Sequence, residues 1–105
     1  MGMALAVTVS KTRKCNKITL TLEGRLDAAT SPQLQEALIQ AFDEGTLVEL
    51  DFAKLTYVSS AGLRVLLIGQ KAATAKNARM TLCGVSTEVM DVFEMTGFAD
   101  VLTFT

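Results

Sequence analysis

Apolar and polar residues alternate in two short segments near the start of the chain, over residues 4–10 and 18–23. A period of two residues is typical of strands that bury one face. The polar and cationic segment 11–16 lies between them and is too short for a crossover connection. The pattern therefore predicts a hairpin of two antiparallel strands, and Gly24 is expected to end the second strand.

A helical pattern follows, because apolar residues recur every three or four positions over residues 34–42 while polar residues occupy the remaining positions. Thr30 or Ser31 is expected to cap this helix, and Pro32 suits its first turn, where a missing amide costs nothing. Gly45 is expected to end the helix in a left-handed conformation.

The next segment, residues 47–52, is more continuously apolar and predicts a central strand. A turn is expected over residues 53–58. The small residues of the segment 59–62 then precede a second apolar helical run, expected from about Ser60 to Lys76.

A short strand over residues 79–83 is expected next, then a third helix capped by Ser86 and closed by Gly97. Residues 101–104 form either a last short strand or a docked tail. A strand, helix, strand unit over 47–83 indicates parallel strands. The expected fold is a single α/β domain spanning residues 1–105, with a mixed sheet of four or five strands, about three main helices and the order β-β-α-β-α-β-α-(β).

Charge and composition narrow the classes of function. The net charge is −1, from 10 basic and 11 acidic residues, so no basic footprint for nucleic acid is expected. No segment approaches the roughly 18 apolar residues that a membrane helix needs, and the N-terminus lacks the features of a secretory signal. We therefore expect a cytoplasmic protein without direct membrane insertion.

Metal, cofactor and enzyme chemistry find little support in the residues. Histidine is absent, and Cys15 and Cys83 lack metal-ligand spacing, so neither a metal nor a cofactor is expected. Neither of the common glycine-rich phosphate-binding motifs occurs. A serine nucleophile would depend on a lysine such as Lys54 or Lys71 as its base. We expect a protein that is not an enzyme, so any phosphoryl transfer would need ATP and magnesium on a partner.

Ser60 has two interpretations. In the first, Ser59-Ser60 is a helix cap whose hydroxyl accepts from the free amides of the first turn and stabilises the fold by about 1 kcal/mol. The positive end of the helix dipole would also favour a phosphate attached there. Ala61 and Gly62 would let another protein approach closely, and Arg64, four residues on, would project from the same face toward an added phosphate. Arg64 is alternatively an exposed solubilising residue.

Two segments resemble a known family. The sequence YVSSAGLRVLL at 57–67 resembles the phosphorylation-site motif of STAS domains, and specifically of stand-alone anti-sigma factor antagonists. The sequence LEGRLDAATSPQLQEAL at 22–38 is similar to the family's other hallmark, a strand that ends in Gly-x-Leu-Asp before the first helix. The spacing of the two segments and the order of elements along nearly the whole chain also fit the family.

The resemblance implies a binding module. In this family the unphosphorylated protein binds an anti-sigma factor, which is also a serine protein kinase, and displaces the sigma factor that it holds. The kinase supplies ATP and magnesium, phosphorylation breaks the complex, and a phosphoserine phosphatase resets it. The alternative function is a non-phosphorylated STAS adaptor subunit of an ABC-type lipid transport complex in the membrane.

The resemblance also implies roles for individual residues. The family's phosphoserine falls on Ser60, and the aspartate of its Gly-x-Leu-Asp loop, near that serine on the binding face, falls on Asp27. The family often has aspartate before the phosphoserine, whereas this chain has Ser59, which is the alternative acceptor. The expected partner-binding residues are Asp27, Ser59, Ser60, Ala61, Gly62 and Arg64.

Overall fold

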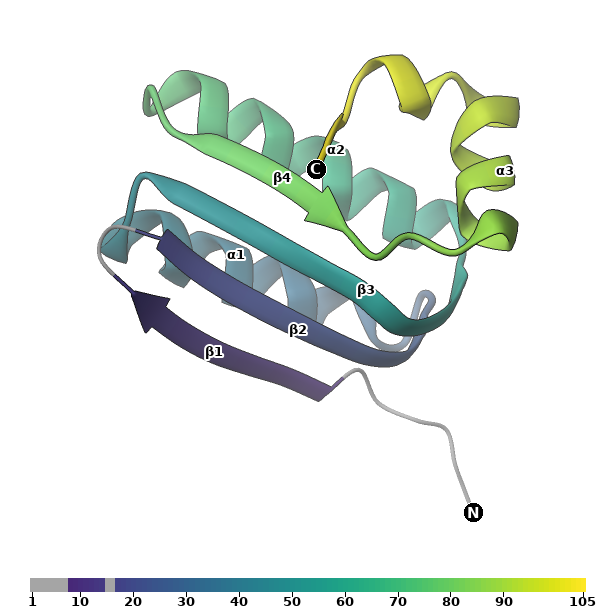
Figure 1. The fold of residues 1–105 in the computed structure, drawn as a ribbon, viewed down its shortest axis with the longest axis horizontal. Coiled ribbons are helices and arrows are strands. Elements are labelled where there is room, and N and C mark those ends of the chain that lie inside the picture. The colour runs from purple at the N-terminus through teal and green to yellow at the C-terminus, as the bar shows by residue number, and fades with distance from the viewer. Residues whose placement is uncertain (1–7, 15–16) are drawn as a thin grey trace.

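Five strands of the described chain form one mixed sheet, accompanied by three α-helices (Figure 1). The computed structural model describes residues 8–14 and 17–105. The elements in chain order are β1 (Thr8–Lys14), β2 (Lys17–Leu26), α1 (Ser31–Glu44), β3 (Leu47–Val58), α2 (Ser60–Ala75), β4 (Arg79–Cys83), α3 (Thr87–Thr96), the short 3-10 helix η1 (Phe98–Asp100) and β5 (Thr103–Phe104). This order confirms the predicted α/β fold with a mixed sheet.

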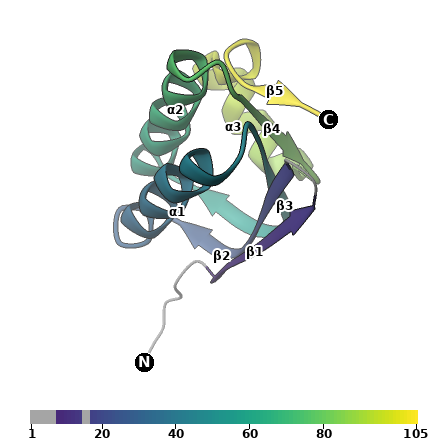
Figure 2. The same cartoon turned by 90° about the vertical axis from the view of Figure 1, so that its left-hand side faces the viewer.

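The strands follow one another across the sheet in sequence order, from β1 to β5. β1 is antiparallel to β2, and the other neighbouring pairs are parallel. α1 and α2 lie side by side on one face of the sheet (Figure 2). Buried side chains of β2, β3, α1 and α2 fill the space between the layers: Ile18, Leu20, Leu22, Val48, Leu50, Phe52, Leu34, Leu38 and Leu66.

The N-terminal hairpin is longer than its side-chain pattern indicates. A strand was expected over 4–10 and a loop over 11–16, yet β1 runs to Lys14 and pairs with β2 up to the contact Lys14↔Lys17. Strand pairing is made by backbone groups, so a polar, cationic sequence does not by itself end a strand. Residues 4–7 and 15–16 lie outside the described part of the chain.

Strands β2 and β3 both continue past their expected ends. β2 runs through Gly24 to Leu26, because Gly24 adopts a φ of 111° beside two shifts in the register with β3. The turn expected over 53–58 is instead the second half of β3. Its buried residues, Leu55 and Val58, are three positions apart, and these irregularities hide the period of two.

Some helix ends lie where the sequence predicts them with the expected conformation, and others differ from the prediction. Ser86 caps α3, and Gly97 ends it with a φ of 83°, as expected. Asn77, with a φ of 55°, follows the end of α2. The left-handed end expected at Gly45 is wrong, because its φ is −155° and the chain leaves α1 in an extended conformation. Thr30 occupies the cap position of α1, but its side chain makes no capping hydrogen bond.

α3 lies at the end of the sheet beyond the tip of β4 (Figure 1). Its anchor is Phe93, which is fully buried. The centroid of the Phe93 ring lies 6.3 Å from that of Phe52 on β3 and 5.8 Å from that of Phe104 on β5. These tilted aromatic contacts join the C-terminal part of the chain to the core.

Candidate functional site

The parallel pairing of β2 and β3 brings the two distinctive segments of the sequence together. Carboxyl ends of parallel strands meet at the same edge of a sheet, and here Leu26 pairs with Val58. The amide of Ser59 then donates a hydrogen bond of 2.8 Å to the carbonyl of Leu26. The loop that carries Asp27 therefore lies beside the start of α2, which carries Ser60.

Asp27 organises the loop between β2 and α1. One carboxylate oxygen, Oδ1, accepts hydrogen bonds from the amides of Ala29 at 3.0 Å and Thr30 at 3.1 Å. The amide of Asp27 donates in return to the Thr30 hydroxyl at 2.9 Å, and that hydroxyl donates to the carbonyl of Arg25 at 2.6 Å. The Ser31 hydroxyl donates to the carbonyl of Asp27. Side chains of this kind close a loop by satisfying its backbone groups.

Opposing effects act on the pKa of Asp27. Desolvation raises this pKa, but the hydrogen bonds from Thr30 and Ala29 and the charge of Arg25 outweigh it. The pKa therefore lies below its ordinary value of 3.8, and the carboxylate is ionised at neutral pH. The loop presents a fixed negative charge beside α2.

The two serines at the start of α2 have different structural roles. Ser59 is the N-terminal cap, because its half-buried side chain accepts a hydrogen bond of 3.3 Å from the amide of Gly62. Ser60, for which capping was one of two interpretations, is the first helical residue and is exposed. Among the described residues, the Ser60 hydroxyl has no hydrogen-bond partner. The capping role and the exposed position thus fall on neighbouring residues.

Gly62 allows the first turn of α2 to approach β2 closely. A Cβ atom at this position would lie 2.9 Å from Cγ of Leu26 and 3.0 Å from its carbonyl oxygen. Such distances leave no room for a side chain unless the helix moves away. Gly62 was predicted as a partner-binding residue, but the structure buries it, and its visible role is to position the neighbouring serines.

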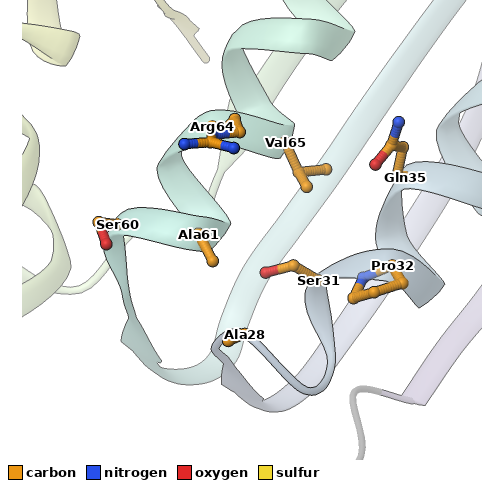
Figure 3. A pocket seen from close by; sticks show the side chains of 8 residues that line it. All are labelled: Ala28, Ser31, Pro32, Gln35, Ser60, Ala61, Arg64 and Val65. Atoms are coloured by element: carbon orange, nitrogen blue, oxygen red, sulfur yellow. The ribbon is translucent and has the colours of Figure 1, made fainter.

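A shallow depression of about 330 Å³ lies between the N-terminal turns of α1 and α2 (Figure 3). Ser60 and Arg64 line it from neighbouring turns of α2, and both residues are exposed. The remaining lining residues are Ala28, Ser31, Pro32, Gln35, Ala61 and Val65. Asp27 belongs to the adjoining loop and does not line the depression. The structure thus brings Ser60, Ala61 and Arg64 together and places Asp27 next to them.

The prediction from sequence did not include Arg25 and Tyr57. These residues pair in register at the ends of β2 and β3, and the Arg25 guanidinium lies over the Tyr57 ring, 4.2 Å from its centroid. Both side chains are exposed, and Tyr57 retains 41% of its accessible surface. Each residue closely precedes one site residue in the chain, but a stack between two distant segments leaves no signal in either segment alone.

The described residues contain no group of three histidine, cysteine, aspartate or glutamate side chains arranged to hold a metal ion. Cys83, at the end of β4, is a free thiol, and burial together with the nearby Glu49 and Asp51 raises its pKa. None of the helices in residues 8–14 and 17–105 combines the length and hydropathy that a membrane span requires.

Comparison with known proteins extends these observations. A family profile described as "Mlab, STAS domain" matches residues 9–103. The anti-sigma-B factor antagonist of Listeria monocytogenes is 30% identical over 93 residues, which cover 88% of this chain and 82% of that protein. The anti-sigma-B factor antagonist of Staphylococcus epidermidis is 32% identical over 80 residues, covering 75% of this chain and 74% of that protein.

Solved structures show the same fold. The anti-sigma factor antagonist SpoIIAA in its unphosphorylated form superimposes with a TM-score of 0.78 at 21% identity, over 93% of this chain and 88% of that chain. The phosphorylated form of the Bacillus protein gives a TM-score of 0.72 at 20% identity, over 95% of this chain and 91% of that chain. With the profile match and the named relatives, these findings establish that the chain belongs to the STAS domain family and is related to the anti-sigma factor antagonists.

Proposed function

We propose that this domain is an anti-sigma factor antagonist that is switched by phosphorylation of Ser60. In its unphosphorylated form it binds an anti-sigma factor that is also a serine protein kinase, and the sigma factor held by that protein is released. The kinase supplies ATP and magnesium and phosphorylates Ser60, which ends the interaction. A phosphoserine phosphatase restores the binding form.

The observation that carries this proposal is the exposed hydroxyl of Ser60 at the first turn of α2, beside the loop of Asp27. A kinase needs an accessible hydroxyl, and this one has no hydrogen bond to give up among the described residues. The Ser59 oxygen, in contrast, is half-buried and accepts from the amide of Gly62. Ser60 is therefore the favoured acceptor, and Ser59 the positioning residue.

The switch can be local. A phosphate on Ser60 adds a charge of about −1.5 to −2 at neutral pH. The free amides at the start of α2 and the neighbouring Arg64 would tolerate this charge in the free domain. In a complex the phosphate would be desolvated and would face the ionised Asp27. Each effect is of order 1–3 kcal/mol, so together they would weaken binding by well over tenfold.

Two other functions receive less support. The relatives named above are anti-sigma factor antagonists, so the transport-adaptor alternative is not favoured. A serine enzyme would need a base in contact with its nucleophile. Within the described residues, neither Lys54 nor Lys71 forms a hydrogen bond with Ser60.

The test uses the anti-sigma factor kinases encoded in the source genome, each purified and paired with this domain. One kinase is expected to bind the domain and to add a single phosphate, detected by intact mass after addition of ATP and magnesium. Ser60→Ala should abolish the mass shift, and Ser60→Asp should weaken binding more than tenfold. Ser86→Ala, which removes the cap of α3, is the matched control and should still be labelled.

The outcomes separate the alternatives. Labelling that persists in Ser60→Ala and disappears in Ser59→Ala would move the acceptor to Ser59. Undiminished binding by Ser60→Asp would contradict the switch. A stable complex with a permease and an ATPase that is unaffected by either serine variant would support the adaptor function instead.

A further inference from the structure

We infer that Arg25 and Tyr57 form a preordered anchor for the partner, and that the anti-sigma factor presents a carboxylate to Arg25. This inference rests on the proposed function and adds to it the chemistry of the partner surface. The anchor is defined by these two residues.

The anchor lies at the strand ends that also carry the site. Arg25 and Tyr57 pair in register, one position before the pair formed by Leu26 and Val58. β4 pairs with β3 only as far as Asp51, so the end of β3 that carries Tyr57 has β2 as its pairing neighbour. Thr56 ties the same ends together, because its hydroxyl donates a hydrogen bond of 3.0 Å to the carbonyl of Gly24.

The stack favours one arrangement of two large side chains before any partner arrives. The guanidinium lies over the exposed Tyr57 ring at 4.2 Å, an attractive cation–π arrangement. Arginine and tyrosine are among the residue types in which interface binding energy concentrates. Side chains that are already ordered lose less conformational freedom on binding. The exposed face of the stack therefore has the properties of a binding anchor.

The N–H groups at the edge of the Arg25 guanidinium indicate which chemical group of the partner binds there. Among the described residues, no ion pair involves Arg25. The nearby Asp27 directs Oδ1 to the amides of Ala29 and Thr30. A planar guanidinium with unengaged N–H groups matches a carboxylate, which it binds through two parallel hydrogen bonds. An aspartate or glutamate of the partner is thus the complementary group.

The charges carried by the end of β2, the loop that follows it and the start of α2 favour the same partner. Arg25 and Arg64 outweigh the carboxylate of Asp27 by one positive charge. Glu23 and Lys54, which are partners in the strand register, carry opposite charges and so do not change this sum. A phosphate on Ser60 adds about −1.5 to −2, which changes the sign of the local charge. A carboxylate on the partner would be attracted before phosphorylation and repelled afterwards.

The test measures binding of the unphosphorylated domain to the kinase that labels Ser60, at about 0.1 M salt, where charged contacts still act over roughly 10 Å. Arg25→Ala should weaken binding about tenfold or more, and Arg25→Glu should weaken it further. Arg25→Lys keeps the charge but lacks the planar fork, so it should weaken binding less than Arg25→Ala. Tyr57→Phe should bind within about twofold of wild type, whereas Tyr57→Ala should weaken binding about tenfold.

Lys71→Ala is the matched control for the loss of one positive charge. Lys71 is exposed on α2, eleven residues beyond Ser60, which corresponds to roughly 16 Å along the helix. This variant should bind like wild type. Thermal melts of all variants report whether the fold is retained, and the exposed positions predict melting temperatures close to that of wild type.

The results distinguish this inference from the proposed function. If wild type binds and is labelled while Arg25→Ala matches Lys71→Ala, the anchor is wrong and the antagonist function stands. If Arg25→Glu binds more tightly than wild type, the partner surface is basic and the inferred carboxylate is wrong. If no kinase binds or labels wild type, the proposed function fails and the anchor fails with it.

Discussion

The amide of Ser59 donates a 2.8 Å hydrogen bond to the carbonyl of Leu26, and this bond joins the end of β2 to the start of α2. The residue after Leu26 is the ionised Asp27, and the residue after Ser59 is the exposed Ser60. Backbone pairing therefore sets how the two polar groups lie relative to each other. Substitution of Ser60 should change the chemistry of the site while the backbone stays in place, whereas Asp27 also holds its own loop through the amides of Ala29 and Thr30.

Ser59→Ala is expected to lower the free energy of unfolding by about 1 kcal/mol, because the amide of Gly62 loses its capping acceptor. Urea denaturation measures this loss. Ser59→Asp is the matched control, since aspartate also caps helices and favours the positive end of the dipole, and it should stay close to wild type. A Ser59→Ala variant as stable as wild type would show that this hydrogen bond contributes little.

Gly62→Ala should destabilise the protein by about 1–3 kcal/mol, since the new Cβ meets Cγ and the carbonyl oxygen of Leu26 at 2.9 and 3.0 Å. Gly69→Ala is the comparison in the same helix. Its Cβ would meet Cδ1 of Leu38 and the sulfur of Met80, both on flexible side chains that can move. Chemical denaturation should therefore give Gly62→Ala a clearly lower free energy of unfolding than Gly69→Ala. The opposite order of stability would refute this account.

Asp27→Asn tests the pH dependence of stability. The pKa of Asp27 in the folded protein is below its ordinary value of 3.8, so folding favours the ionised form. Its contribution is complete at pH values above 3.8 and is lost as the pH falls through the folded pKa. The stability difference between wild type and Asp27→Asn should be constant from about pH 7 to 5 and change in favour of Asp27→Asn below about pH 4. Denaturant titrations across this range measure it, and a constant difference down to about pH 3 would contradict the lowered pKa.

Phe93→Ala should cost about 3–5 kcal/mol of unfolding free energy, because it empties a fully buried site between Phe52 and Phe104. Met95 lies two residues further along α3, and its side chain is 85% exposed. Met95→Ala should therefore change the free energy of unfolding by less than about 0.5 kcal/mol. Equal effects of the two variants would mean that α3 is not anchored through Phe93.

The fold was predictable where side-chain patterns match regular elements. The helical spacing over 34–42 and the caps at Ser86 and Gly97 are local signals, and the structure contains them. The ends of β2 and β3 were not predictable, because bulges interrupt the period of two. Glycine at position 24 is compatible with a strand that ends there and with a strand that continues, so the sequence alone does not distinguish the two.

The candidate site was predictable as two segments, but its internal geometry was not. Two adjacent serines before a helix offer two equivalent caps, and only the backbone conformation assigns that role to Ser59. Gly62 suits a low-profile surface in the sequence, yet the proximity of Leu26 buries it. The contact of Arg25 with Tyr57 depends on strand register, which no local pattern encodes.

The separation of roles between Ser59 and Ser60 has a consequence for repeated use of the domain. The hydroxyl that caps α2 belongs to Ser59 and the exposed hydroxyl belongs to Ser60, so the proposed phosphate on Ser60 would leave the capping hydrogen bond intact. Under the proposed function, the domain would need no unfolding or refolding between successive rounds of phosphorylation. The pace of such a cycle would be set by the enzymes that act on the domain and not by any relaxation of the domain itself.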